Sequence, residues 1–129
     1  MPDYFLALNK QYGIALNDAQ AELQAKAVVQ SWYLSLPALK QQKLCSNLPE
    51  YLLPNRKLFF NQRLDFSKET QSDLVFTRLN YQLQKTDPKE IETILKGVFK
   101  SLKIILNHQQ KFELSRLLDK KLLAIFVNA

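Results

Sequence analysis

The sequence contains few of the residue types from which chemical sites are built. Only one of its 129 residues is a cysteine and only one is a histidine. A single cysteine excludes an internal disulfide, and no paired ligand spacing indicates a zinc site. We expect Cys45 to be a buried, inert thiol, because Leu44 and Leu48 share the apolar side of its predicted helix. His108 falls in a predicted turn, where we expect a surface histidine. No metal is implied.

Glycine and proline are also scarce, with two and five residues. Gly13 and Gly97 cannot form the glycine-rich loop that holds a phosphate group, which excludes a nucleotide-binding motif of that kind. Gly97 falls within a predicted helix, where we expect it to allow close packing against another helix. With 47% hydrophobic and 23% charged residues, the composition predicts one compact domain over 1–129, and not two domains or a disordered tail.

The sequence has no long apolar run. A membrane span needs about 18 or more consecutive apolar residues, and no such stretch is present. Met1-Pro2-Asp3 lacks the basic start and the apolar core of a signal peptide. We therefore expect a cytoplasmic protein without a membrane span.

Acidic residues gather in the first turns of predicted helices. They are Asp18, Glu22, Glu69, Asp87, Glu90 and Glu92. Helix dipoles and free backbone N–H groups explain carboxylates in first turns without general acid catalysis. No nucleophile with a neighbouring base accompanies them. The sequence therefore predicts no catalytic residue, no cofactor and no small-molecule substrate, and we expect a protein that is not an enzyme.

The clearest structural signal is a long helix that begins at Asp87. The Asp87 carboxylate can accept from free backbone donors, Pro88 suits the first helical turn, and Glu90 occupies the capping-box position. Apolar residues then recur at three- and four-residue steps on one face: Ile91, Ile94, Leu95, Val98, Leu102, Ile105 and Leu106. Asn107 with Gln110 starts a shorter returning helix, either continuous or broken, whose apolar stripe includes Phe112 and Leu114. The two helices are predicted to form a helical hairpin.

One half of the sequence repeats the other when it is shifted by seventy residues without gaps. Asn17 then coincides with Asp87, and Gln20 with Glu90, so that both capping positions agree. Further residues of the first half coincide with identical ones: Glu22, Lys26, Val28, Ser31, Leu36, Leu44, Leu48, Leu52 and Leu53. Two independent amphipathic helices of one period would explain part of this agreement. The caps and the turn also align, which favours an internal duplication.

These patterns predict an all-α protein, a single compact bundle of about 6–8 helices built from two similar helical repeats. Repeat one spans about 3–54 and repeat two about 67–127, with a strap at 55–66 between them. Asp3 is predicted to cap a first short helix, and Ser67 to cap the first helix of repeat two. The strap either fills the seam between the repeats with its phenylalanines, which is the favoured interpretation, or serves as a binding loop.

Three stretches carry a family resemblance: Tyr12-Gly13, Ala21-Glu22-Leu23-Gln24-Ala25-Lys26-Ala27-Val28 and Leu48-Pro49-Glu50-Tyr51-Leu52. In these stretches the chain resembles the bacterial domain of unknown function number 2267, over nearly its whole length. The resemblance implies two helical repeats in a domain of similar length. That family has no established active site, so it implies no catalytic residue. The chain differs in having Leu118-Asp119 where the second repeat often has a second Leu-Pro.

Charge is distributed unevenly along the chain. The net charge is +6; residues 1–50 hold four basic and four acidic side chains, whereas 51–129 hold fourteen and eight. The long helix carries a predicted outer row of Lys89, Lys96, Lys100 and Lys103, and the strap adds Arg56, Lys57 and Arg63 around two phenylalanines. Basic residues interleaved with aromatic ones can bind RNA or single-stranded DNA through phosphate contacts and stacking. A solvated helix face, tempered by Glu92, is the other interpretation.

An apolar strip on the outer side of the long helices suggests a different function. Leu23 and Leu34 lie nearly opposite the main apolar stripe of the first long helix, and Leu34 coincides with Ile104 after the shift. These residues are either a binding surface or core between the repeats. The leading hypothesis is a protein-binding or self-associating helical module, and a basic nucleic-acid-binding accessory protein is the alternative.

Overall fold

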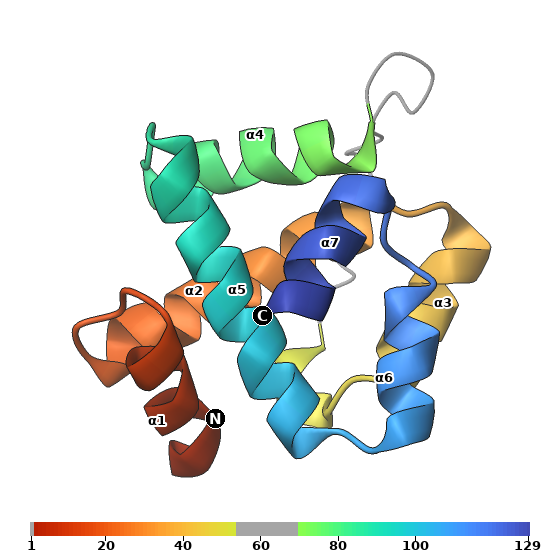
Figure 1. Ribbon diagram of the computed structural model, residues 1–129, viewed down its shortest axis with the longest axis horizontal. Helices are drawn as coiled ribbons and strands as arrows, with labels where there is room; N and C mark the ends of the chain where they lie inside the picture. Colours follow the sequence, from red (N-terminus) through yellow and green to blue (C-terminus); the bar gives the residue numbers. More distant parts are fainter. Residues whose placement is uncertain (1, 54–69) are drawn as a thin grey trace.

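The computed structural model describes residues 2–53 and 70–129, and within them the chain forms only helices (Figure 1). In chain order they are α1 (Asp3–Tyr12), α2 (Asp18–Leu34), α3 (Ala38–Ser46), the 3-10 helix η1 (Glu50–Leu52), α4 (Gln71–Leu83), α5 (Pro88–Ile105), α6 (His108–Ser115) and α7 (Lys120–Asn128). The predicted all-α bundle is confirmed. The strap lies outside the described residues, and so do Arg56, Lys57 and Arg63.

The same series of elements occurs in both halves. The long helices α2 and α5 begin at Asp18 and Pro88, seventy residues apart. The same interval separates the starts of α3 and α6, at Ala38 and His108, and the starts of η1 and α7. The predicted internal repeat therefore describes the order and the spacing of the elements.

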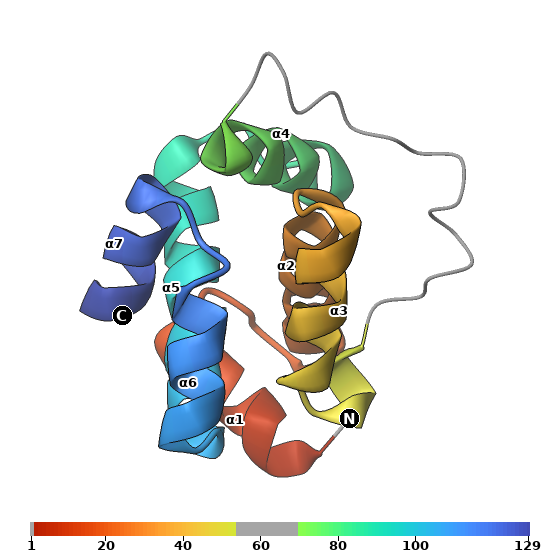
Figure 2. The ribbon, with the colours of Figure 1, turned by 90° about the vertical axis from the view of Figure 1, so that its right-hand side faces the viewer.

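The two halves interlock. Helix α1 packs mainly against α5 of the second half, and α4 packs mainly against α2 of the first half. The central helices α2 and α5 also contact each other, while α3 and α6 lie side by side and antiparallel (Figures 1 and 2). Figure 2 shows α4 closing one end of the bundle and α1 the other. This exchange of first helices gives the fold an approximate two-fold arrangement.

One hydrophobic core joins the halves. The Trp32 ring meets the edge of Phe99 with centroids 5.7 Å apart, and Phe99 meets Phe126 at 5.3 Å. The indole Nε1–H of Trp32 donates to the Leu117 carbonyl oxygen at 3.0 Å, which satisfies its buried polar atom. Trp32 therefore links the first half to α5 and to the turn after α6 in the second half.

The predicted starts of the long helices are confirmed. Asn17 accepts from the Gln20 backbone N–H at 2.8 Å, and Asp87 accepts from that of Lys89 at 2.9 Å. A complete capping box occurs at Asn107 and Gln110 and not at Asp87. The Glu90 carboxylate instead lies 3.7 Å from the Lys85 ammonium group. The complete capping box therefore occurs at the start of α6, whose sequence signal is weaker than that of α5.

One predicted cap is wrong, and another lies outside the described residues. Asp3 is the first residue of α1 and makes no cap; Pro2 occupies the N-cap position without a side-chain hydrogen bond. The predicted cap Ser67 lies outside the described residues; as described, helix α4 begins at Gln71, where the Thr70 hydroxyl accepts from the Asp73 backbone N–H at 3.2 Å.

The predicted hairpin is also only partly right. The returning segment breaks into α6 and α7, and only α7 packs closely along α5, whereas α6 lies beside α3 of the other half. Phe112, expected in the buried stripe, is 58% exposed. Helix α6 is short and buries only Leu114 of its own residues, so the side chain of Phe112 extends into solvent.

Gly97 permits the closest approach between helices. A Cβ atom at Gly97 would lie 2.7 Å from the Cα of Gly13 and 2.9 Å from its backbone nitrogen. Such distances are shorter than any ordinary contact, so the glycine lets the end of α1 rest directly on α5. The predicted role of Gly97 in helix packing is confirmed.

Asp119 explains the departure from the Leu-Pro pattern. Its carboxylate accepts from the Leu122 backbone N–H at 2.9 Å and from the Ser72 N–H at 2.8 Å, so it caps α7 and α4 together. The Gln71 amide completes the joint, accepting from the Asp119 N–H at 2.6 Å and donating to the Leu117 carbonyl at 2.7 Å. A proline at 119 would have neither the carboxylate nor the N–H.

Candidate interaction surfaces

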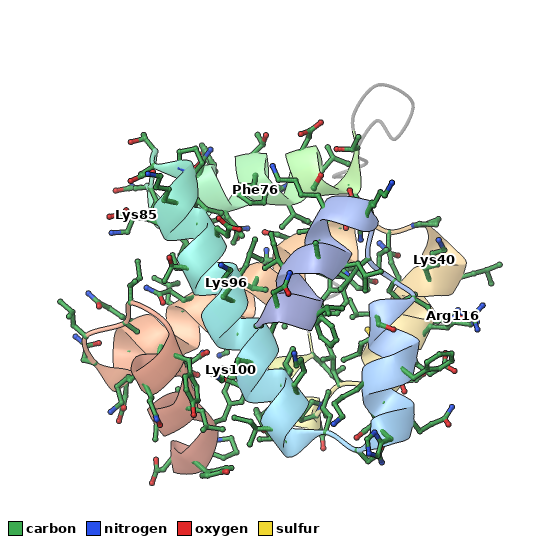
Figure 3. All side chains as sticks on the ribbon, in the orientation of Figure 1. Lys40, Phe76, Lys85, Lys96, Lys100 and Arg116 are labelled. Atoms are coloured by element: carbon green, nitrogen blue, oxygen red, sulfur yellow. The ribbon has the colours of Figure 1, made fainter. Side chains whose placement is uncertain are left out.

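The lysine row on α5 is locally compensated. Lys96 is exposed and its ammonium group lies 4.0 Å from the Glu92 carboxylate, one turn away. The Lys100 ammonium lies 4.2 Å from the centre of the Tyr12 ring. Figure 3 shows Lys96 and Lys100 on successive turns of α5. Lys89 is exposed in the first turn of this helix. The predicted row exists for these three residues, with part of its charge already engaged.

Lys103 does not extend the row into solvent. Its ammonium group donates to the backbone oxygens of Phe126 at 2.9 Å, Val127 at 3.3 Å and Ala129 at 3.0 Å. Burial, followed by the nearby ammonium groups of Lys100 and Lys111, lowers the pKa of Lys103. A cation at the last carbonyls of a helix stabilises its C-terminal end, so Lys103 is a helix-capping residue for α7.

The predicted apolar strip is wrong at Leu34. Leu34 is 4% exposed, because α2 is covered by α1, α3, α4 and α5 and its far side is part of the interior. Leu23 and Ile104 are 59% and 43% exposed, as expected. They occupy the early turns of α2 and the last turn of α5, which lie apart in both views of the ribbon. The structure therefore does not unite the three residues in one interface.

Leu23 instead belongs to a small hollow at the α1–α2 turn. This hollow has a volume of about 270 Å³ and is lined by Ile14, Leu16, Gln20, Leu23, Gln24, Leu83 and Lys85. Leu16 is 86% exposed at its edge. The surface is apolar but limited in extent.

A larger groove lies along α3 and α6. Its volume is about 600 Å³, and its lining is Leu39, Lys40, Gln42, Lys43, Ser46, Asn47, Glu113, Arg116 and Leu117. Leu39 is 77% exposed. Because α3 and α6 are antiparallel, the start of α3 adjoins the end of α6, and Figure 3 shows Lys40 and Arg116 on the same side of the molecule. We call this feature the α3–α6 groove.

The cations of the α3–α6 groove have no carboxylate partner within the described residues. None of the ion pairs found there involves Lys40, Lys43 or Arg116, and all three side chains are exposed. The Arg116 guanidinium carbon lies 5.8 Å from the centre of the Phe112 ring, which places Phe112 at the rim. The Glu113 carboxylate accepts from the Gln109 side-chain amide at 3.3 Å.

Sequence reasoning missed this groove, although helical spacing contained a signal. At about 100° per residue, Leu39 lies about 140° from the buried Leu44 on α3, and Phe112 about 160° from the buried Leu114 on α6. Each is therefore off the buried face of its own helix. Lys40 and Lys43 lie within residues 1–50, which hold equal numbers of basic and acidic side chains. The distribution of net charge along the sequence therefore did not indicate a basic surface there.

The part of the chain that the structure describes holds no obvious centre for chemistry. Across 2–53 and 70–129, no three His, Cys, Asp or Glu side chains gather as metal ligands. Cys45 is buried, and His108 is exposed as the first residue of α6, not in a turn. In the same residues, none of the helices combines the length and the apolar character needed to cross a bilayer.

Comparisons with known proteins yield no relative. No protein-family model, no curated protein and no solved structure matches the chain. Nothing in them bears on the resemblance to the two-repeat bacterial family, which stays a prediction from the sequence motifs.

Proposed function

We propose that this chain is a non-enzymatic helical module that binds another protein through the α3–α6 groove. One observation carries the proposal: one groove on the surface of two packed helices is lined by an exposed leucine and by three cations that have no carboxylate partner among the described residues. An exposed apolar side chain at a hollow, edged by charges, is typical of protein interaction sites. We place the module in the cytoplasm and in the two-repeat family on the sequence motifs alone.

The groove has fixed walls, which favours binding. Leu44 of α3 and Leu114 of α6 are completely buried, and Leu117 at the end of α6 is nearly so. The Leu117 carbonyl also accepts hydrogen bonds from Trp32 and Gln71. A partner therefore meets a surface whose backbone is already ordered, so little conformational entropy is lost on association.

A photo-crosslinking amino acid at position 39 tests the proposal. In cells that make the protein, we expect it to yield a discrete polypeptide adduct that is lost when Arg116→Glu is added. Leu16 is a matched control, since it is also a strongly exposed leucine but lies at the small hollow. No polypeptide adduct at position 39, or adducts at position 16 alone, would show that the groove is not the binding site.

The alternative function, a nucleic-acid-binding accessory protein, is favoured by the net charge of +6 and by the exposed Lys89 and Lys96 on α5. Binding to phosphates weakens steeply with salt, so bound nucleic acid should co-purify at low salt and be lost at high salt. If this alternative holds, the combined change of Lys89, Lys96 and Lys100 to Gln should weaken binding to all sequences about equally and reduce its salt dependence.

A further inference from the structure

We infer that the occupant of the α3–α6 groove is an amphipathic helix of another protein, with acidic residues on both sides of its apolar stripe. This inference rests on the proposed function and adds the chemistry of the partner. Two antiparallel helices form an elongated trough, and an amphipathic helix is a common ligand for a surface of that shape. Leu39, which is 77% exposed, supplies apolar atoms for its stripe.

Charge complementarity specifies the flanks of the partner. Lys40 and Lys43 are three residues apart and so share one side of α3, while Arg116 faces the groove from α6. Glu113 is the one carboxylate in the lining, which leaves a local charge of +2. A helix lying in the groove thus meets cations on both sides, and acidic residues on both of its flanks would pair with them.

The position of Arg116 is already favourable for a carboxylate. The centre of the Phe112 ring lies 5.8 Å from the Arg116 guanidinium carbon, within the range of a cation–π contact, and this side chain forms no ion pair within the described part of the chain. A carboxylate from the partner can accept two hydrogen bonds from the guanidinium group at once. Arg116 is therefore the cation that we expect to contribute most.

The described part of the chain, 2–53 and 70–129, does not offer such a helix. Asp18, Glu22, Glu90 and Glu92 pair with Lys10, Lys26, Lys85 and Lys96. No helix in the described part of the chain carries two carboxylates that both lack a lysine partner. A second copy would have to break such a pair to bring an acidic face to the groove, so the partner is a different protein.

Selection from a library of random peptides tests the inference. Peptides of about 16 residues, long enough for about four helical turns, are displayed and selected on the full-length protein. We expect the recovered sequences to place apolar residues at steps of three and four, with Asp or Glu on both sides. A parallel selection on the Leu39→Ser, Arg116→Glu double variant should not recover them.

Affinity measurements on one recovered peptide sharpen the result. By fluorescence anisotropy, exchange of its acidic residues for Gln should weaken binding about tenfold or more, and high salt should weaken binding of the acidic form. Lys40→Glu and Arg116→Glu in the protein should each weaken binding of the acidic peptide, while the control Lys89→Glu should not. A peptide in which Lys replaces the acidic residues should have a higher affinity for the Lys40→Glu, Arg116→Glu variant than for the unsubstituted protein.

Each of the other outcomes overturns the inference. An acidic helix would be excluded if the selection recovered no peptide or recovered neutral, basic or non-helical peptides. It would also be excluded if the recovered peptides bound the Leu39→Ser, Arg116→Glu variant equally well. A short single-stranded oligonucleotide that binds the same groove, or a concentration-dependent dimer abolished by Arg116→Glu, would identify a different occupant. Because all four substituted residues are exposed, circular dichroism and melting of the variants should be unchanged. The position-39 crosslink still decides separately whether the groove binds a protein.

Discussion

At the scale of single residues, Gly97 determines how closely α1 can approach α5. Gly97→Ala would normally favour a helix interior by about 1 kcal/mol. Here the new Cβ would lie 2.7 Å from the Gly13 Cα, a backbone atom that cannot move independently. We therefore expect Gly97→Ala to lower the free energy of unfolding by about 2 kcal/mol.

Urea denaturation measures this effect, and Lys96→Ala is the control. Lys96 lies next to Gly97 on the same helix but is exposed, so its replacement should change stability by no more than about 0.5 kcal/mol. An unchanged or higher stability for Gly97→Ala would mean that α1 moves away from α5 without cost.

The partial burial of Tyr51 leads us to expect a loss of stability at alkaline pH. Its ring lies edge to face against Phe5 with centroids 6.0 Å apart, and burial raises the pKa of the Tyr51 hydroxyl above its ordinary value of 10.0. Between 10.0 and the raised pKa, the folded protein holds this proton while the unfolded chain releases it. The stabilisation is therefore complete below pH 10.0 and decreases as the pH rises through that interval.

The Tyr51→Phe variant isolates this contribution because it keeps the ring and removes the hydroxyl. Urea unfolding on both sides of pH 10.0 should show a smaller alkaline loss in the variant than in the original protein. The lowered pKa of Lys103 acts in the opposite direction, since the unfolded chain then holds more protons, but it acts in both proteins and cancels in their difference. Identical pH dependence in both proteins would contradict the assigned burial of Tyr51.

At the scale of helices, the Asp119 joint couples two helix starts that are far apart in sequence. Removing an N-cap side chain costs about 1 kcal/mol, and Asp119 serves both α4 and α7. We expect Asp119→Ala to lower the free energy of unfolding by about 2 kcal/mol.

Asn17→Ala provides the matched comparison, because Asn17 caps α2 alone and its loss should cost about 1 kcal/mol. Both variants are compared by urea denaturation, with the dependence on urea checked for a constant slope. If Asp119→Ala cost no more than Asn17→Ala, the hydrogen bond to Ser72 would contribute nothing to stability.

At the scale of the whole molecule, neither half contains its own core. Because α1 packs on α5 and α4 on α2, separation of the halves exposes the apolar face of every long helix. Isolated helices of this length are marginal in water. We expect fragments 1–53 and 70–129 to be largely unfolded alone and to regain helix when mixed in equal amounts.

Trp32 reports on this association, since it is the one tryptophan of the chain and it packs against Phe99 of the second half. Its fluorescence should shift to shorter wavelength on mixing. A second fragment with Val98→Asp should fail to restore it, because the substitution places a charge in the core. Cooperative melting of either fragment alone would show that the halves are independent domains.

The sequence by itself determined the two long helices, their starts and the seventy-residue spacing between equivalent elements. Asn17 reaches the Gln20 N–H and Asp87 that of Lys89, so each cap depends on residues within one turn of the chain. The apolar spacing likewise identified the face that each long helix buries, with Val28 and Val98 at equivalent positions in the core. These properties depend on residues close together in the chain, so they can be inferred without the tertiary structure.

Only the tertiary structure decided which apolar and charged residues meet solvent. Leu34 is buried because other helices cover the far side of α2, and Phe112 is exposed because α6 contacts α3 through another face. Lys103 reaches the carbonyls of α7, and the α3–α6 groove forms where two helices seventy residues apart run antiparallel. Periodicity says which residues share a face of a helix, but what covers that face depends on contacts between distant segments, which no local pattern records.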